Sequence, residues 1–129
     1  NSNRDLIIFS NTLDNKKILS FKNAGVEVIH TNKFNNGFLD IREILFSLNK
    51  KGINRLLIEG GSTLAYSFIN RNFVNEVYWF SSKHNIINSK LSNESDKKLY
   101  SIKKGNIFLL KDCINLRDNK LEIFKLEKD

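Results

Sequence analysis

Short apolar runs alternate with amphipathic segments along this chain of 129 residues, and no other feature constrains its fold as strongly. The apolar runs are rich in Ile, Leu and Val, which is typical of buried strands, while the segments between them repeat apolar residues at helical spacing. This order predicts an α/β fold with a mixed, mostly parallel sheet and a C-terminal antiparallel hairpin. Strands are expected at residues 5–10, 26–30, 53–59, 75–82, 106–116 and 120–127.

The best-marked helix is predicted to begin after Asp40. Glu43 lies three residues further on, as in a capping box, in which the two side chains satisfy free amides at the helix start. Gly25 and Gly52 are expected to end the first and second helices, and a third helix should follow residue 61. The polar residues 83–98 are expected to be a surface loop. The apolar face of the helix after Asp40 would consist of Ile41, Ile44, Leu45 and Leu48.

The composition limits the classes of protein to which this chain can belong. A chain of 129 residues with 40% hydrophobic content is expected to form a single domain with a core of its own. It has no apolar run long enough to cross a membrane and does not begin like a signal peptide. Cys113 is the only cysteine, which excludes an internal disulfide and fits a reducing compartment. We therefore expect a cytoplasmic protein in which Cys113 is an inert core thiol.

The formal charge of +7 allows two interpretations. The joint abundance of Asn, Lys and Ile indicates an AT-rich genome, whose mutational bias alone would raise the lysine content. Alternatively, the charge attracts an anionic ligand such as a phosphate, or a nucleic acid. A nucleic-acid surface would be formed by the lysines of the later loops: Lys97, Lys98, Lys103 and Lys104.

The stretch LLIEGGSTLAYSF, residues 56–68, places two of the six glycines side by side between a predicted strand and a predicted helix. In parallel sheets, ligands bind beyond the carboxyl ends of the strands, where helix N-termini gather. Glycine lets the backbone approach a ligand closely, and the first amides of a helix attract anions. The alternative is a tight turn that has Ser62 or Thr63 as its cap. The pattern is neither a P-loop nor a dinucleotide fingerprint.

Residues 53–80, INRLLIEGGSTLAYSFINRNFVNEVYWF, resemble the C-terminal reductase domain of the bacterial riboflavin-biosynthesis deaminase/reductase. The matching features are a hydrophobic strand that ends in Glu-Gly-Gly, a Thr-Leu pair that opens a helix, and residues 73–76 before the next strand. The resemblance covers residues 5–82 well and the tail only loosely. It implies a three-layer dihydrofolate-reductase-like fold, with NADPH as the hydride donor. The implied substrate is 5-amino-6-(5-phosphoribosylamino)uracil, a phosphoribosyl-pyrimidine, whose ribosyl group becomes ribityl.

The resemblance also implies roles for individual residues. Glu59 would bind substrate, and the start of the helix would bind the cofactor pyrophosphate. No residue is assigned as the catalytic acid. The family also implies a homodimer and, from the geometry common in its fold, a cis peptide between Gly60 and Gly61. The implied pyrophosphate residues are Gly61, Ser62, Thr63, Leu64 and Ala65.

Several family features have no counterpart in these residues. The first strands of the reductase domain do not match any part of the sequence, so we expect a C-terminal portion of that domain, inactive alone and prone to self-association. One cysteine and no proline exclude a zinc deaminase centre, and His30 and His84 are expected to be solvated. Tyr78 and Trp79 are expected to be packing residues. The alternatives are another reductase of the same fold and a basic nucleic-acid-binding domain.

Overall fold

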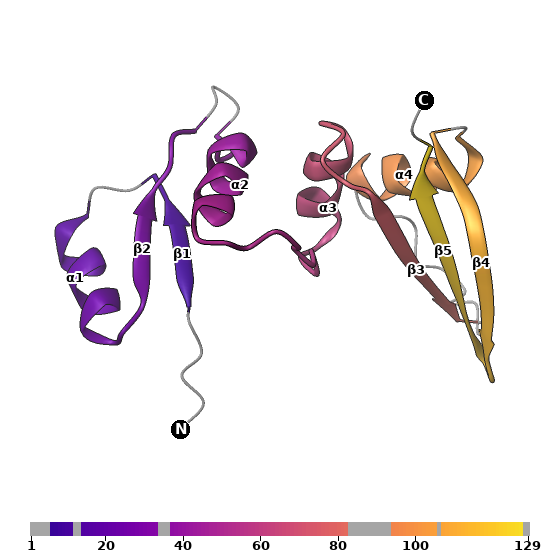
Figure 1. Ribbon diagram of the computed structural model, residues 1–129, viewed down its shortest axis with the longest axis horizontal. Coiled ribbons are helices and arrows are strands. Elements are labelled where there is room, and N and C mark those ends of the chain that lie inside the picture. The colour runs from indigo at the N-terminus through magenta and orange to yellow at the C-terminus, as the bar shows by residue number, and fades with distance from the viewer. Residues whose placement is uncertain (1–5, 12–13, 34–36, 83–93, 106, 128–129) are drawn as a thin grey trace. The chain divides into compact units, whose positions relative to one another are not determined.

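The computed structural model describes residues 6–11, 14–33, 37–82, 94–105 and 107–127. The chain divides into two compact units, Asn1–Leu56 and Leu57–Asp129, which are described separately. No described helix has the length and hydrophobicity that crossing a bilayer demands. The α-helices and strands, labelled in Figure 1, are β1 (Ile7–Ser10), α1 (Asn15–Asn23), β2 (Glu27–His30), α2 (Ile41–Lys50), α3 (Ser62–Ile69), β3 (Glu76–Ser82), α4 (Glu94–Tyr100), β4 (Phe108–Leu116) and β5 (Asn119–Leu126). The 3-10 helix η1 (Ser101–Lys104) follows α4.

The first unit is built on a parallel pair of strands, as the sequence predicted. β1 and β2 pair from Ile7 opposite Glu27 to Ser10 opposite His30, and α1, which connects them, lies beside β2 (Figure 1). Thr31 extends the pairing by donating its amide to the Ser10 carbonyl at 2.9 Å. Its side chain is only 2% exposed. The unit is therefore a βαβ element followed by α2.

Capping residues set the limits of both helices of this unit. Asp14 accepts hydrogen bonds from the first amides of α1, and Asp40 accepts one from the Arg42 amide. Gly25 and Gly52 follow the two helices with φ of 75° and 80°, a left-handed conformation that glycine adopts without steric cost. The predicted cap and both predicted helix ends are therefore confirmed. Ile41 and Leu48 are buried, as expected for the apolar face of α2.

The predicted capping box is only half correct, because Glu43 does not reach back to the amide of Asp40. Its carboxylate accepts hydrogen bonds from the amide of Asn32 at 2.8 Å and from the Asn32 side chain at 2.7 Å. The Asp40 amide instead donates to the Asn32 carbonyl at 2.9 Å. Glu43 thus ties α2 to the segment after β2, a contact between residues that local spacing alone cannot indicate.

Residues 53–59 do not form the strand that the sequence predicted. Ile53 donates its amide to the Leu48 carbonyl at 3.1 Å, but no described residue provides a partner for the backbone of residues 55–59. Leu56 and Leu57 are 47% and 75% exposed. An apolar run supplies the propensity for a strand, but a strand also needs a neighbour to complete its hydrogen-bond ladder. The parallel part of the fold is therefore smaller than predicted.

The second unit contains an antiparallel sheet with the strand order β3–β5–β4 (Figure 1). The hairpin of β4 and β5 confirms the predicted C-terminal hairpin, and Arg117 in its two-residue turn has a φ of 53°. A bulge interrupts β4 between Leu110 and Asp112. The mixed α/β class, with a parallel pair and an antiparallel hairpin, is confirmed.

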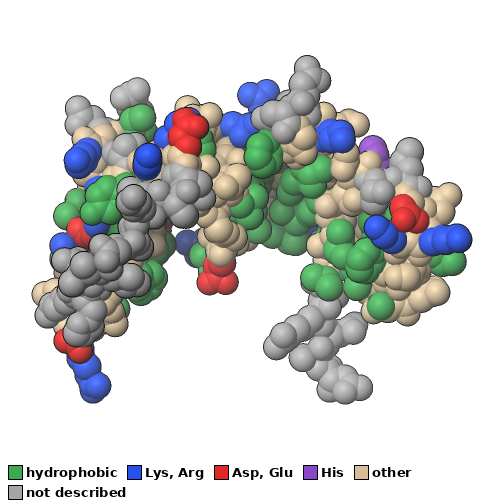
Figure 2. Space-filling view, turned by 180° about the vertical axis from the view of Figure 1, so that it is seen from behind, with side chains coloured by type: hydrophobic (Ala, Val, Ile, Leu, Met, Phe, Trp, Pro, Cys, Tyr) green, Lys and Arg blue, Asp and Glu red, His purple; other side chains and the backbone are tan. Residues whose placement is uncertain are grey.

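One face of this sheet forms the core of the second unit. Ile102, Phe108 and Phe124 are buried there. Partly buried side chains from α3, β3, α4 and β5 pack around them. Trp79 belongs to this layer and meets the Tyr100 ring edge-on at 5.8 Å, which confirms its predicted packing role. Tyr78 points away and is 52% exposed, so the same prediction for Tyr78 was wrong. Hydrophobic side chains also reach the surface in the view of Figure 2.

Part of the predicted surface loop is a helix. α4 covers Glu94–Tyr100, while residues 83–93, including His84, lie outside the described residues. Lys98 is 2.6 Å from the Glu94 carboxylate one helical turn away. This i,i+4 pair stabilises a helix, and it is the sequence signal that could have predicted α4.

Candidate anion site at the start of helix α3

The candidate site is the start of α3, where the segment after residue 59 turns into a helix. Gly61 is the N-cap residue, and no side chain caps the helix there. The amides of Leu64 and Ala65 donate to the Gly61 carbonyl at 3.0 and 3.2 Å, so they are committed to the helix. Ser62 and Thr63 follow the N-cap in the first turn, at the positive end of the helix dipole. The first turn carries no acidic residue that would repel an anion.

The glycine at residue 60 leaves room for the Leu64 side chain of the helix. A Cβ at this position would overlap the Leu64 side chain, coming within 3.3 Å of both its Cβ and its Cγ. Leu64 is itself 47% exposed, so its side chain closes over the backbone at Gly60 rather than entering the core. The absence of a side chain at residue 60 thus has a structural reason.

No contact with a described residue explains why residue 61 is a glycine. Its φ of −54° and ψ of 172° are open to any residue, and a Cβ there would meet no atom within 4 Å. The surface in front of Gly61 is therefore open, and the glycine leaves the backbone bare beside the first amides of α3. A bound group that approaches this backbone closely would explain the glycine.

The predicted cis peptide between Gly60 and Gly61 is wrong, because every peptide bond between described residues is trans. Gly61 reaches the helix through an ordinary extended conformation. The turn therefore needs no cis bond, which is costly when proline is not involved.

The implied binding residues differ in what they can offer a ligand. Glu59 is exposed beside Gly60, where its carboxylate could accept hydrogen bonds from hydroxyl groups. Thr63 is exposed, and its carbonyl accepts the Ser67 hydroxyl at 2.8 Å. Ala65 is half-buried. Gly61, Ser62 and Thr63 could thus contact an anion through backbone or hydroxyl groups, whereas Leu64 and Ala65 could offer only apolar contact.

A lysine that the sequence interpretation placed in a loop lies next to α3. The Lys98 ammonium is 5.3 Å from the centre of the Tyr66 ring, a cation–π contact from α4 to α3. Its hydrogen bond with Glu94 lowers the pKa of Glu94 and raises the pKa of Lys98. Lys98 and Glu94 therefore both stay charged as an ion pair, and Lys98 connects α4 to α3 through its contact with Tyr66.

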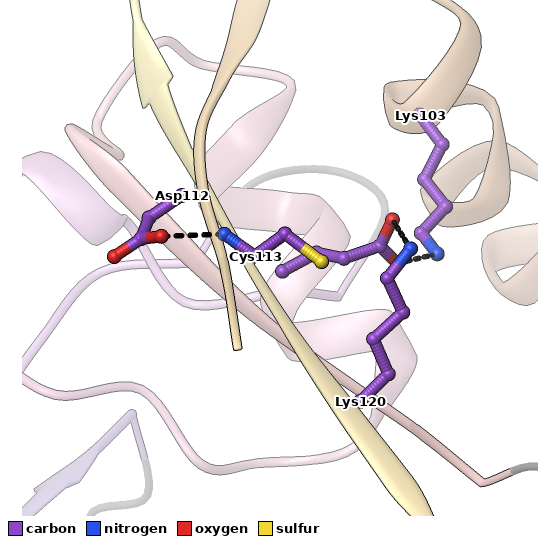
Figure 3. Close-up of polar contacts among 5 residues, drawn as sticks. Lys103, Asp112, Cys113 and Lys120 are labelled. Carbon is purple, nitrogen blue, oxygen red and sulfur yellow. Dashed lines mark hydrogen bonds and ion pairs between the residues drawn. The ribbon is translucent and has the colours of Figure 1, made fainter. Parts of the chain in front are cut away.

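A second charged cluster lies in the sheet and is formed by Glu122, Lys103 and Lys120 (Figure 3). Glu122 is 9% exposed; Lys103 donates to one of its oxygens, and Lys120 lies 3.0 Å from the other. The hydrogen bond from Lys103 is the main cause that lowers the pKa of Glu122, against the opposing effect of burial. Lys103 also lies 5.1 Å from the centre of the Trp79 ring. The cluster holds η1 to the sheet.

Cys113 is exposed, so the predicted core thiol is wrong. Its apolar run is β4, one of the two outer strands of the described sheet, in which every residue from Leu110 to Leu116 is exposed. Apolar composition predicts a strand but not its place at the edge. The Asp112 carboxylate accepts the Cys113 amide at 2.7 Å (Figure 3).

The described residues give little support to the other ligand classes. His30 is exposed, as expected, and no group of three potential metal ligands occurs in the described part of the chain. Of the four lysines that the nucleic-acid interpretation requires, Lys98 and Lys103 form ion pairs with Glu94 and Glu122. Such pairs reduce the charge available to a phosphate backbone.

Comparison with known proteins decides the family. The profile of the RibD C-terminal domain matches residues 1–82, which include the whole start of α3. The chain belongs to the RibD C-terminal domain family. This confirms the resemblance seen in the Glu-Gly-Gly segment and its flanking elements.

A solved structure supports the fold of this RibD C-terminal domain. A pyrimidine reductase-like protein from Corynebacterium diphtheriae superposes with a TM-score of 0.70 over 95% of the chain, at 16% sequence identity. The similarity confirms the dihydrofolate-reductase-like fold. The chain spans 50% of the length of that protein.

Proposed function

We propose that this chain forms the cofactor-phosphate end of an NADPH-dependent pyrimidine reductase of riboflavin biosynthesis. The observation that carries the proposal is Gly61: neither its conformation nor its neighbours require glycine, yet it leaves an open surface at the start of α3. A pyrophosphate is the group whose charge and size suit such a helix start. Membership of the RibD C-terminal domain family supports the same conclusion.

The proposed substrate is 5-amino-6-(5-phosphoribosylamino)uracil in its open-chain imine form. NADPH, when bound, supplies a hydride to the imine carbon, which gives the ribitylamino product and NADP⁺ once a proton has added to the nitrogen. The residues of this chain would bind and orient the reactants. Ser62 and Thr63 would hold the pyrophosphate, and the exposed Glu59 carboxylate would accept a hydrogen bond from a substrate hydroxyl.

Cofactor titration tests the proposal. NADPH and NADH are titrated separately while the fluorescence of Trp79, the single tryptophan, is followed. Saturable binding of NADPH that greatly exceeds binding of NADH is expected. Gly61→Val should remove the binding, because its side chain would fill the open surface, at a cost of about 1 kcal/mol in unfolding free energy.

Gly105→Val is the matched control, because Gly105 also has an ordinary extended conformation, with φ of −87° and ψ of 160°, and follows η1 rather than preceding α3. Undiminished NADPH affinity in the Gly61→Val protein would refute the site. Equal loss in both variants would show that the effect is not specific to the start of α3. Steeply salt-dependent binding to arbitrary DNA, without NADPH binding, would favour the nucleic-acid alternative.

A further inference from the structure

The outer strand β4 combines an apolar sequence with an exposed position in the sheet of the second unit. Every residue from Leu110 to Leu116 is exposed, and β4 pairs on one side only, with β5. An apolar strand at the edge of a sheet can pair with the strand of another chain, which leads to aggregation. A feature that blocks this edge would therefore protect the protein.

The hairpin register identifies the backbone groups of β4 that face away from β5. β4 ends at Leu116 and β5 begins at Asn119, so the turn has two residues, and the residues on either side of such a turn form a hydrogen-bonded pair. Hydrogen-bonded and non-hydrogen-bonded pairs alternate along an antiparallel ladder. Cys113, which lies opposite Glu122, therefore belongs to a non-hydrogen-bonded pair, and its amide points outward from the sheet.

We propose that Asp112 closes this edge of the sheet to strand addition. Its carboxylate accepts the outward-facing amide of Cys113 at 2.7 Å (Figure 3), so the donor that an added strand would use is already bound. A carbonyl oxygen of an added strand would have to displace the carboxylate. The displaced carboxylate would then lie among carbonyl oxygens and away from water, which is costly for a charged group.

The irregularity of β4 beside Asp112 has the same effect. Leu110 lies opposite Phe124 and Asp112 opposite Ile123, so Lys111 is an extra residue with no partner in β5. A bulge of this kind bends a strand and increases its twist, and a lysine on an edge strand also opposes pairing. The bulge, Lys111 and the bound Cys113 amide thus lie within four consecutive residues of the same edge.

Removal of the carboxylate tests this role in the 129-residue chain. In Asp112→Val the amide of Cys113 is free to donate to a second copy, and the new side chain favours strands. Sedimentation velocity under reducing conditions should show self-association about tenfold tighter than that of wild type. The change also adds to a net charge of +7, which by itself opposes association.

Hydrogen exchange locates the contact, and Asp112→Ala separates the lost carboxylate from the added strand propensity. The Cys113 amide of Asp112→Val should exchange more slowly as the protein concentration rises, while that of wild type should not. Asp112→Ala should also associate more tightly than wild type, because the acceptor is lost there too. Near-ultraviolet circular dichroism identifies the variants that remain folded.

Two controls separate the carboxylate from charge and from apolar surface. Asp112→Asn makes the same charge change but keeps an oxygen that can accept the Cys113 amide, and Asn115→Val adds the same apolar side chain to the same edge. Both should associate as wild type does. Folded Asp112→Val and Asp112→Ala proteins that associate no more tightly than wild type would overturn the proposal. So would equally tight association of either control.

Discussion

Leu64 lies over Gly60 so closely that its side chain occupies the space a Cβ on the glycine would need. Its neighbour Gly61 has open space at the same position. The two adjacent glycines are therefore present for different reasons: the first permits packing within the chain, and the second keeps a surface open. This difference can be measured, because stability and ligand binding should respond to different residues of the pair.

The first prediction concerns stability at the two glycines. Gly60→Ala should lower the unfolding free energy by about 1–2 kcal/mol, because Leu64 must move aside, whereas Gly61→Ala, which changes only the helix N-cap, should cost about 0.5–1 kcal/mol. Urea unfolding followed by Trp79 fluorescence measures both. In a Leu64→Ala background, most of the cost of Gly60→Ala should disappear, because the contacts with Cγ and Cδ2 are gone and only the one with Cβ is left. Equal costs at the two glycines would contradict the assignment of Leu64 as the cause.

Features that depend on residues close together in the sequence could be predicted. Asp40, Gly25 and Gly52 mark helix limits through interactions within one helical turn, and these predictions are confirmed. The segment of residues 53–59 could not be assigned in this way, since forming a strand depends on a partner that the run itself does not specify. The exposure of Cys113 likewise depends on which strand lies at the edge of the sheet.

The candidate site was predicted only in part. The Glu-Gly-Gly pattern located the start of α3, but it could not separate the packing role of Gly60 from the open surface at Gly61. That distinction depends on the rotamer of Leu64, which is a property of the folded chain. The contact of Lys98 with Tyr66 was missed because the polar composition around α4 concealed a helix.

A second prediction concerns Glu43, which connects α2 to Asn32. Glu43→Ala should destabilise the start of α2 by about 1 kcal/mol, since two hydrogen bonds of a carboxylate are lost. Amide hydrogen exchange in the first turn of α2 should accelerate accordingly. Asn32→Ala added to Glu43→Ala should have little further effect, because the interaction is already absent. Fully additive effects of the two changes would show that the residues act independently.

A third prediction follows from the Glu122 cluster. The pKa of Glu122 is lowered in the folded protein from its ordinary value of 4.5, mainly by the hydrogen bond from Lys103. The ionised carboxylate therefore stabilises the fold above that value, and the contribution is lost as the pH falls through the folded pKa. Glu122→Gln should cost about 1–3 kcal/mol at neutral pH, and the difference from wild type should shrink as the pH falls below 4.5 and through the folded pKa.

Glu94→Gln provides the control for this pH dependence. Glu94 pairs with Lys98 in the same way, but its side chain is 79% exposed, so solvent screening leaves the pair little net effect. The denaturation midpoint of Glu94→Gln should stay close to that of wild type across the same pH range. A Glu122→Gln cost that persists unchanged at low pH would mean that packing, and not ionisation, makes the residue important.

The last prediction concerns activity of the 129-residue chain in isolation. The chain spans 50% of the length of the C. diphtheriae protein, and the segment that leads into Glu59 pairs with no described strand. Glu59 and the start of α3 are therefore not fixed by a sheet on that side. Because a misplacement of about 1 Å can cost about 100-fold in rate, the chain alone should show no measurable NADPH oxidation with the ribosylaminouracil substrate.

A polypeptide that adds the remaining strands of a RibD reductase domain to these residues should restore turnover at equal molar concentration. Turnover by the isolated chain within about tenfold of the extended one would show that these 129 residues already position both reactants, and that further strands are not needed for the chemistry.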